Sequence, residues 1–359
     1  MLVASAKIEP CIMPKEDPEW RFALRADPVS ESWIVELTSD SGVVGWGCAS
    51  PSPHMGSNMA TAESALREFL PMLVGRDIMD IEALVSDMDS RLAGHYHAKA
   101  GIDCAFYDLA ARCLDLPLYK LLGGKVRDRV PVLRILAIKS PDKMAANAMA
   151  LVDKGYRYLK IKVHGDVHED VARVRAIRKA VGDEVHLTVD ANQSYNAKDA
   201  IRALNRMADY DIEIAEQPVP GGDLEGLKLV TDSVEVIVEA DESARTLEDV
   251  AFLVKHRIVD AITLKAPRFG GLRNTIAAAR ICESGNVRHR IGSAVGSRLL
   301  AATSMHLAAS LPGVDYACEL GEFDRLLNDP FEGVEIVDGG MDLPQGIGCG
   351  VRPRIPVST

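Results

Sequence analysis

Five charged residues recur at regular intervals in the middle of the chain. They are Lys162, Asp190, Glu216, Asp241 and Lys265, and each ends a short apolar run that is typical of a buried strand. Neighbouring members lie about one strand–helix unit apart, and the carboxyl ends of parallel strands meet at one rim. The spacing therefore predicts a site at which three carboxylates converge between two lysines.

Three converging carboxylates repel one another unless a cation neutralises them. Asp190, Glu216 and Asp241 offer only oxygen ligands, and such a set suits Mg²⁺. Mn²⁺ is a possible substitute, because carboxylate oxygens also suit that ion. We therefore expect these three residues to bind one divalent metal ion and to leave room on it for substrate oxygens.

The two lysines predict proton transfer on either side of that metal site. A substrate held there would present one face to Lys162 and the other to Lys265. A lysine can donate or accept a proton once burial or nearby positive charge lowers its pKa. Lys160 lies two residues before Lys162, so it could supply positive charge on that side.

The second part of the chain predicts a barrel. From about residue 130, short β-rich runs alternate with helical stretches, an order that indicates βαβ units and a parallel sheet. The runs cover 130–138, 158–163, 185–190, 212–216, 234–240, 260–265, 288–292 and 314–319, and the helical stretches include 145–154, 167–181, 197–208, 247–255, 272–284 and 297–310. Eight such units close into a barrel with its site at the carboxyl ends of the strands. An open doubly wound sheet would need a phosphate-binding loop, and the sequence has neither GxGxxG nor GxxxxGK[ST].

The first 125 residues mix strand and helix signals. Residues 32–37 and 42–48 read as a hairpin, and helical patterns follow at 60–73, 81–92 and 98–114. We therefore predict an α+β domain over 1–125 and the barrel over 126–324.

Composition excludes several classes of protein. The 359 residues carry 41 Lys+Arg against 52 Asp+Glu, a net charge of −11, which disfavours nucleic acid and anionic membranes as partners. No apolar run approaches the ~18 residues that a membrane helix needs, and the start lacks the pattern of a signal peptide. The seven cysteines include no C-x-x-C pair, which favours a reduced, cytoplasmic protein.

The motifs at the strand ends resemble the enolase superfamily, and among its mandelate racemase/muconate lactonizing enzyme-like members they resemble the muconate lactonizing enzyme (muconate cycloisomerase) subgroup. These motifs are KIK at 160–162, DAN at 190–192, EQP at 216–218, DES at 241–243, and Lys265 followed by GGL at 270–272. The N-terminal part is similar to the capping domain of that family at 98–109 and 121–124, and PQGIG at 344–348 resembles its C-terminal return.

The resemblance implies a fold and a reaction class. The fold is a modified TIM barrel, (β/α)7β, with an α+β capping domain to which the segment from about 325 to 359 returns. In the reaction, a substrate carboxylate binds Mg²⁺, a lysine removes the α-proton, and the enediolate is stabilised by charge. Return of a proton on the other face gives racemisation or epimerisation, whereas loss of a β-substituent gives dehydration. Muconate cycloisomerisation reaches the same intermediate by addition to an alkene.

Departures from the family pattern bear on the substrate. Dipeptide epimerases carry Asp-x-Asp on strand eight, whereas this chain has only one acid in Glu319-Leu320-Gly321, which disfavours dipeptides. The Glu-Leu pair is more like the cycloisomerases, and Gly296 stands where many members have Glu. Lys160, Asn192 and Glu319 are expected to act on the substrate through contact or charge.

The favoured function is a Mg²⁺-dependent isomerase of a small carboxylate, as a cycloisomerase or a racemase/epimerase of an amino-acid derivative. The alternative is a dehydratase of a hydroxy acid or hydroxyproline-type substrate, although the His-Asp dyad of sugar-acid dehydratases is missing. A non-catalytic binding or structural protein is the remote alternative, because folding alone does not require converging charges. Two loops, 16–26 and 51–58 with His54, are expected to close over the site, and a homo-oligomer is possible.

Overall fold

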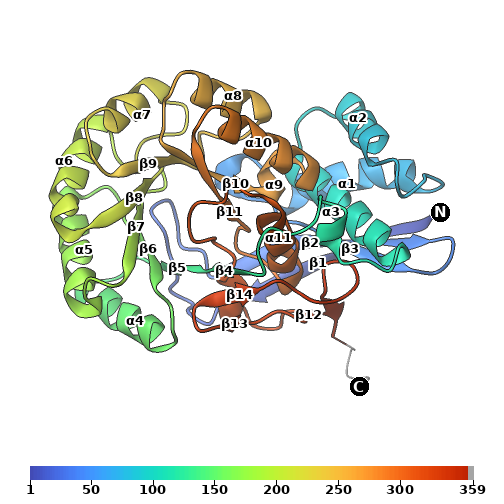
Figure 1. The fold of residues 1–359 in the computed structure, drawn as a ribbon, viewed down its shortest axis with the longest axis horizontal. Helices are drawn as coiled ribbons and strands as arrows, with labels where there is room; N and C mark the ends of the chain where they lie inside the picture. Colours follow the sequence, from blue (N-terminus) through green and yellow to red (C-terminus); the bar gives the residue numbers. More distant parts are fainter. Residues whose placement is uncertain (355–359) are drawn as a thin grey trace.

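The structure is a computed structural model that describes residues 1–354. Its N-terminal part is a three-stranded antiparallel sheet packed against three helices (Figure 1). The elements are β1(Val3–Pro14), β2(Val29–Ser39), β3(Val44–Ala49), α1(Met59–Leu73), α2(Ile81–Arg91) and α3(Tyr96–Cys113). The predicted hairpin corresponds to β2 and β3, and the three predicted helices are present, whereas β1 was not predicted.

The N-terminal part has an apolar core of its own. One face of α1 buries Leu66, Phe69 and Leu73 against the sheet, as the amphipathic pattern requires. Helix α3 approaches β3 so closely that only glycine fits at the crossing, where a Cβ on Gly47 would lie 2.0 Å from the carbonyl oxygen of Gly101. This contact fixes α3 against the sheet.

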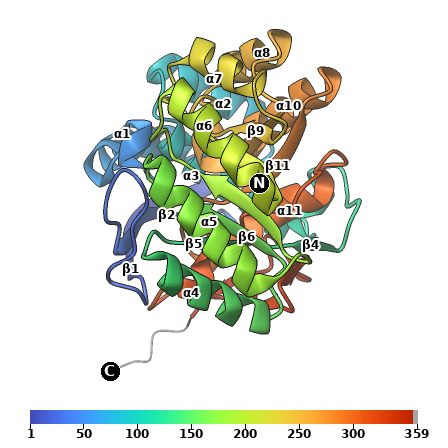
Figure 2. The ribbon, with the colours of Figure 1, turned by 90° about the vertical axis from the view of Figure 1, so that its left-hand side faces the viewer.

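Seven parallel strands form the curved sheet of the second part, in the order β11-β10-β9-β8-β7-β6-β5. They are β5(Leu133–Leu136), β6(Tyr158–Lys162), β7(His186–Asp190), β8(Ile212–Glu216), β9(Ile237–Ala240), β10(Ala261–Lys265) and β11(Arg288–Gly292). Helices cover its outer face, and Figure 2 shows α4, α5 and α6 side by side across it. They are α4(Pro141–Asp153), α5(Val167–Val181), α6(Ala197–Met207), α7(Leu224–Thr231), α8(Leu247–Lys255), α9(Ala266–Phe269), α10(Leu272–Ser284) and α11(Arg298–Ser310). The alternation predicted these units, although α7 and α9 were not predicted.

Two of the predicted strands differ from the structure. The run 130–138 is divided into β4(Arg129–Pro131) and β5, because Pro131 has no N–H with which to continue a ladder. The run 314–319 forms only isolated bridges, which pair Gly292 with Glu319 on one side and Val132 with Cys318 on the other. It therefore occupies the eighth place and closes the ring between β11 and β5 without a continuous ladder, which confirms the (β/α)7β class.

The C-terminal segment packs against the N-terminal part. It contains η4(Glu322–Arg325), β12(Phe331–Glu332), β13(Ile336–Val337), β14(Gly340–Asp342) and β15(Arg352–Pro353). The N–H of Cys349 donates to the carboxylate of Asp108 on α3 at 2.7 Å, and Phe331 contacts Trp46 with their ring centroids 6.3 Å apart. The boundaries at 125 and 324 stay predictions, and residues 355–359 of the predicted return lie outside the described residues. None of the helices in residues 1–354 is long and apolar enough to cross a membrane.

Candidate active site

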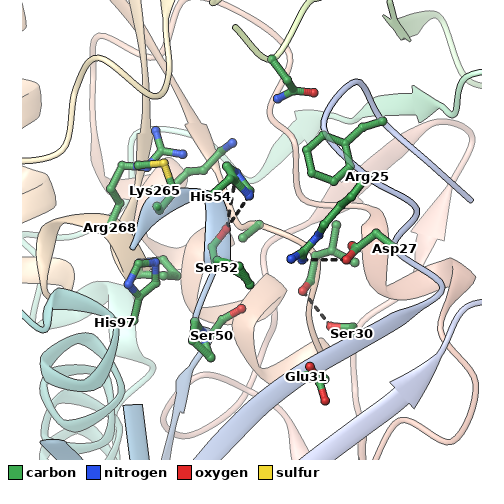
Figure 3. A pocket seen from close by; sticks show the side chains of 18 of the residues that line it. Arg25, Asp27, Ser30, Glu31, Ser50, Ser52, His54, His97, Lys265 and Arg268 are labelled. Atoms are coloured by element: carbon green, nitrogen blue, oxygen red, sulfur yellow. Dashed lines mark hydrogen bonds and ion pairs between the residues drawn. The ribbon is translucent and has the colours of Figure 1, made fainter. Parts of the chain in front are cut away.

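A cavity of about 170 Å³ lies where the carboxyl ends of the strands meet the N-terminal part (Figure 3). The barrel lines it with five of the predicted site residues: Lys162, Asn192, Asp241, Lys265 and Glu319. The N-terminal part lines it mainly with two loops, from which come Trp20, Phe22, Arg25, Pro51, Ser52 and His54. The other three predicted residues do not line the cavity but contact this set: Lys160 pairs with Asp190, Glu216 and Glu319, and Asp190 pairs with Lys162. All eight predicted residues therefore belong to one constellation.

The two predicted acid/base lysines lie on opposite walls of the cavity. Lys162 ends β6 and Lys265 ends β10, and three strands of the ring separate them, so the two strands stand across the barrel from each other. Their exposures are 6% and 8%. Lys162 donates to Asn192 Oδ1 at 2.9 Å and pairs with Asp190, whereas Lys265 donates to Asp241 at 3.1 Å. Each lysine is thus held at the edge of the cavity by polar partners.

The three predicted metal ligands end neighbouring strands. Asp190 lies beside Glu216 in the β7–β8 register, and Asp241 follows β9. Glu216 accepts from Lys160 at 2.6 Å, and Asp241 accepts from Arg268 at 2.5 Å. Burial opposes ionisation of Asp190 and Asp241, but nearby lysines and Arg268 outweigh it and hold both pKa values below the usual range. Asp190 and Asp241 are therefore ionised at neutral pH.

The donor set fits a hard divalent cation. The three carboxylates supply only oxygen, and Glu216 Oε1 is buried with no hydrogen-bond partner among the described residues. Within residues 1–354, however, no three acidic, histidine or cysteine side chains are grouped as a ready metal site. Each of the three carboxylates pairs with a lysine or arginine. The role of Asp190, Glu216 and Asp241 as metal ligands stays a prediction.

Lysine basicity differs from the expectation. Burial disfavours the charged form of Lys265, but Asp241 and Glu319 outweigh burial and raise its pKa. The pKa of Lys265 is therefore shifted in the direction opposite to the lowering that favours a lysine base. Lys160 is also raised well above its usual pKa despite its burial, because Glu216, Glu319 and Asp190 surround it. Lys160 is thus a fixed positive charge.

Comparison with known proteins places this constellation in a family. Residues 143–356 match the family model Enolase C-terminal domain-like, and residues 18–123 match Mandelate racemase / muconate lactonizing enzyme, N-terminal domain. The chain belongs to the mandelate racemase/muconate lactonizing enzyme family of the enolase superfamily.

Its relatives include epimerases and cycloisomerases. An L-Ala-D/L-Glu epimerase of Bacillus subtilis is 38% identical over 81% of each chain, and a chloromuconate cycloisomerase of Cupriavidus necator is 32% identical over 89% of each. Among solved structures, a dipeptide epimerase from Enterococcus faecalis complexed with Mg and the dipeptide L-Leu-L-Tyr superposes with a TM-score of 0.94. It is 34% identical and covers 98% of this chain and 99% of that one. The expected superfamily and its isomerase chemistry are confirmed, and the chain is a magnesium-dependent isomerase in class.

Several residues of this family member's site were not predicted from the sequence. Arg268 pairs with Asp241, and Glu242 accepts from Asn192 Nδ2 at 3.1 Å. Burial and the neighbouring carboxylates raise the pKa of Glu242 to about 8. Arg268 follows Lys265 by three residues, and Glu242 lies within the DES motif at 241–243, so both positions could have been suggested by the sequence.

The two predicted loops do lie over the cavity. The rings of Phe22 and His54 are 5.5 Å apart, and Ser52 Oγ lies 3.0 Å from His54 Nδ1. In Figure 3, Lys265, Arg268 and His97 lie across the cavity from Arg25 and Asp27. Burial lowers the pKa of His54 to about 4, so this residue is neutral at physiological pH. Whether ligand binding orders these loops further stays a prediction.

Proposed function

We propose that this isomerase inverts the carbon atom beside a substrate carboxylate, as a racemase or epimerase. The observation that supports the proposal is the placement of Lys162 and Lys265 on opposite walls of one cavity. One lysine per face is the arrangement that inversion needs, because a base must remove the proton from one face and an acid must return a proton to the other.

The residues of the chain divide the work. In its neutral form, one lysine takes the α-proton on Nζ, and the electron pair of the broken C–H bond spreads into the substrate carboxylate. The opposite lysine, as an ammonium, returns a proton to the other face and becomes the next base. Asp190, Glu216 and Asp241 would hold Mg²⁺, or Mn²⁺ in its place, which supplies positive charge for the substrate carboxylate when bound. Lys160 adds fixed positive charge from below.

The substrate class follows less directly from the site. The dipeptide epimerases among the relatives favour a dipeptide as the substrate. The single acidic residue at 319–321, however, disfavours binding of the ammonium group of a dipeptide. Glu319 also pairs with Lys160 and lies 3.7 Å from Lys265, so its charge is already balanced within the protein. We therefore propose a carboxylate whose nitrogen is acylated or otherwise uncharged. We also propose a cytoplasmic setting, where the seven free cysteines stay reduced.

Deuterium exchange at the α-carbon tests the proposal. Dipeptides, N-acyl amino acids, proline derivatives and muconates are incubated with the protein and Mg²⁺ in D₂O, and wash-in is measured for each enantiomer of the substrate that reacts. Lys265→Ala should retain exchange from the face served by Lys162, and Lys162→Ala should show the converse. Both variants should abolish inversion. On the face whose base has been removed, the rate of α-proton exchange should fall at least about a hundredfold.

Lys228→Ala provides the control, because Lys228 lies on the outer helix α7 and pairs with Asp232. It should leave both exchange rates at the parent level. If one of the two site variants exchanges both enantiomers at near the parent rate, the two faces are not served by two lysines and the racemase proposal is wrong. Loss of a β-substituent without return of the α-proton would instead identify a dehydratase.

A further inference from the structure

The interior of the barrel contains charges below the cavity. Positions that point into a barrel of this type are usually filled by branched apolar side chains. Here the interior includes Lys160 on β6, Glu239 on β9, Thr263 on β10 and Arg290 on β11, and all four are buried. None of them lines the cavity.

Arg290 is the centre of this interior group. It is 1% exposed, and its Nη2 donates to Glu216 Oε2 at 2.7 Å while also pairing with Glu239 Oε2. Its Nε lies 3.3 Å from Thr263 Oγ1. The guanidinium therefore joins Glu216, a residue of the predicted metal set, to two residues that do not line the cavity.

The arrangement of oxygens on Glu216 is asymmetric. Lys160 and Arg290 both bind Oε2, whereas Oε1 has no hydrogen-bond partner in the described part of the chain. A buried carboxylate oxygen without a partner carries an energetic cost unless a ligand satisfies it. Two donors on one oxygen also fix the rotation of the carboxylate, which leaves the other oxygen in a defined place.

We infer that Arg290 is a positioning residue that orients Glu216 toward the divalent metal ion and thereby sets the affinity for that ion. The inference rests on the metal site of the proposed function. Partners that hold a metal ligand from behind commonly matter 10- to 100-fold for metal affinity. Stability alone gives no reason for the buried arginine, because apolar residues of similar volume often replace a buried ion pair without loss.

The sign of the effect separates orientation from charge. Removing the positive charge of Arg290 from the neighbourhood of a cation site would tighten metal binding if charge alone mattered. Removing an orienting contact would weaken it. Arg290→Met takes away both the charge and the contact, so weaker binding by this variant identifies orientation as the dominant role.

The experiment measures metal binding without turnover. Purified full-length protein is titrated with Mn²⁺, free ion is followed by electron paramagnetic resonance, and Mg²⁺ is added as a competitor. Arg290→Met should weaken both ions by at least about tenfold. Arg290→Lys keeps the charge but not the planar fork, and should weaken them by at least about threefold. It replaces Arg290→Met in the test if that variant does not fold.

Two control variants separate orientation from general damage to the barrel. Thr263→Val removes only the 3.3 Å contact from the same interior group, and should leave affinity within about twofold. Arg178→Met removes another buried arginine, whose four hydrogen bonds within the described residues all go to backbone carbonyls on the outer side of the barrel. It should lower thermal stability with affinity unchanged.

The possible results are distinguishable. The inference is overturned if folded Arg290→Met binds Mn²⁺ as tightly as the parent, or more tightly. If Arg290→Met does not fold, the same criterion applies to Arg290→Lys. A parent protein that binds neither ion overturns the proposed metal site itself, and the inference falls with it.

Discussion

Asp103 offers a sharp test of how the two parts of the molecule are joined. It lies on α3 and its Oδ1 accepts from the backbone N–H of Leu272, the first residue of α10, at 2.6 Å. The carboxylate is fully buried, and a Cβ on Gly271 would lie 2.1 Å from Oδ1. Burial raises the pKa of Asp103 to about 7, against an ordinary value of 3.8. The capping helix is therefore fastened to the barrel by a carboxyl group that holds its proton near neutral pH.

The direction of the pH dependence follows from where the proton binds. Between pH 3.8 and about 7, Asp103 is protonated in the folded protein and ionised in the unfolded chain. Because the folded state binds more protons there, stability falls as pH rises through this window. The shift corresponds to roughly 4 kcal/mol as an upper bound, of which about 2 kcal/mol is lost between about pH 5.5 and 8.5.

Asp103→Asn isolates this contribution. The amide keeps a carbonyl oxygen for the N–H of Leu272 but cannot ionise. The unfolding free energy of the variant, relative to that of the parent, should therefore rise by about 2 kcal/mol as the pH increases from about 5.5 to 8.5. Histidines whose pKa burial lowers to about 4, such as His54 and His306, raise stability over the lower part of the same range, but they do so in parent and variant alike. Urea unfolding at both pH values measures the difference, and Asp223→Asn makes the same change at the exposed N-cap of α7. If the Asp103→Asn and parent curves stay parallel within about 0.5 kcal/mol, the reasoning is refuted.

Two glycine substitutions should separate effects on the site from effects on the fold. Gly292→Ala would place a methyl group 2.7 Å from Cε of Lys265. Because the lysine side chain is flexible, thermal stability should change little. The displaced lysine should nevertheless lower kcat about a hundredfold. Gly47→Ala would meet the backbone of Gly101 and Ala105 instead, and should cost about 3 kcal/mol or more of unfolding free energy, seen as a lower denaturant midpoint. Lower thermal stability with an unchanged kcat in Gly292→Ala, or an unchanged denaturant midpoint in Gly47→Ala, would contradict the geometry.

Local sequence patterns predicted most of the barrel because each unit is short and repeats the same alternation. The strands that end in Lys162, Asp190, Glu216 and Lys265 lie within two residues of the predicted runs. Helix α7 escaped prediction because its eight residues are too few for a clear helical period. Strand β1 and the bridging segment 314–319 depend on partners far away in the sequence, and no local pattern specifies which partner a strand takes.

The predicted site followed from strand ends, and the missed residues follow from the same geometry taken one step further. Side chains two residues apart on a strand face the same way, so Glu239 lies below Asp241 and Arg290 below Gly292. The period could therefore have suggested both as interior residues. It could not have shown that they pair, because pairing depends on the stagger of the closed ring rather than on either strand.

Periodic sequence patterns do not specify the substrate. The proton-transfer groups stand on strands whose positions the barrel fixes, whereas most of the remaining cavity wall comes from loops near Trp20 and His54 that follow no period. A rigid barrel can keep its lysines in place while those loops change, so relatives with the same superfamily chemistry include both dipeptide epimerases and chloromuconate cycloisomerases. The spacing of the strand ends therefore indicates the reaction class. The substrate can be inferred only once the fold has brought residues 20, 54 and 319 around one cavity.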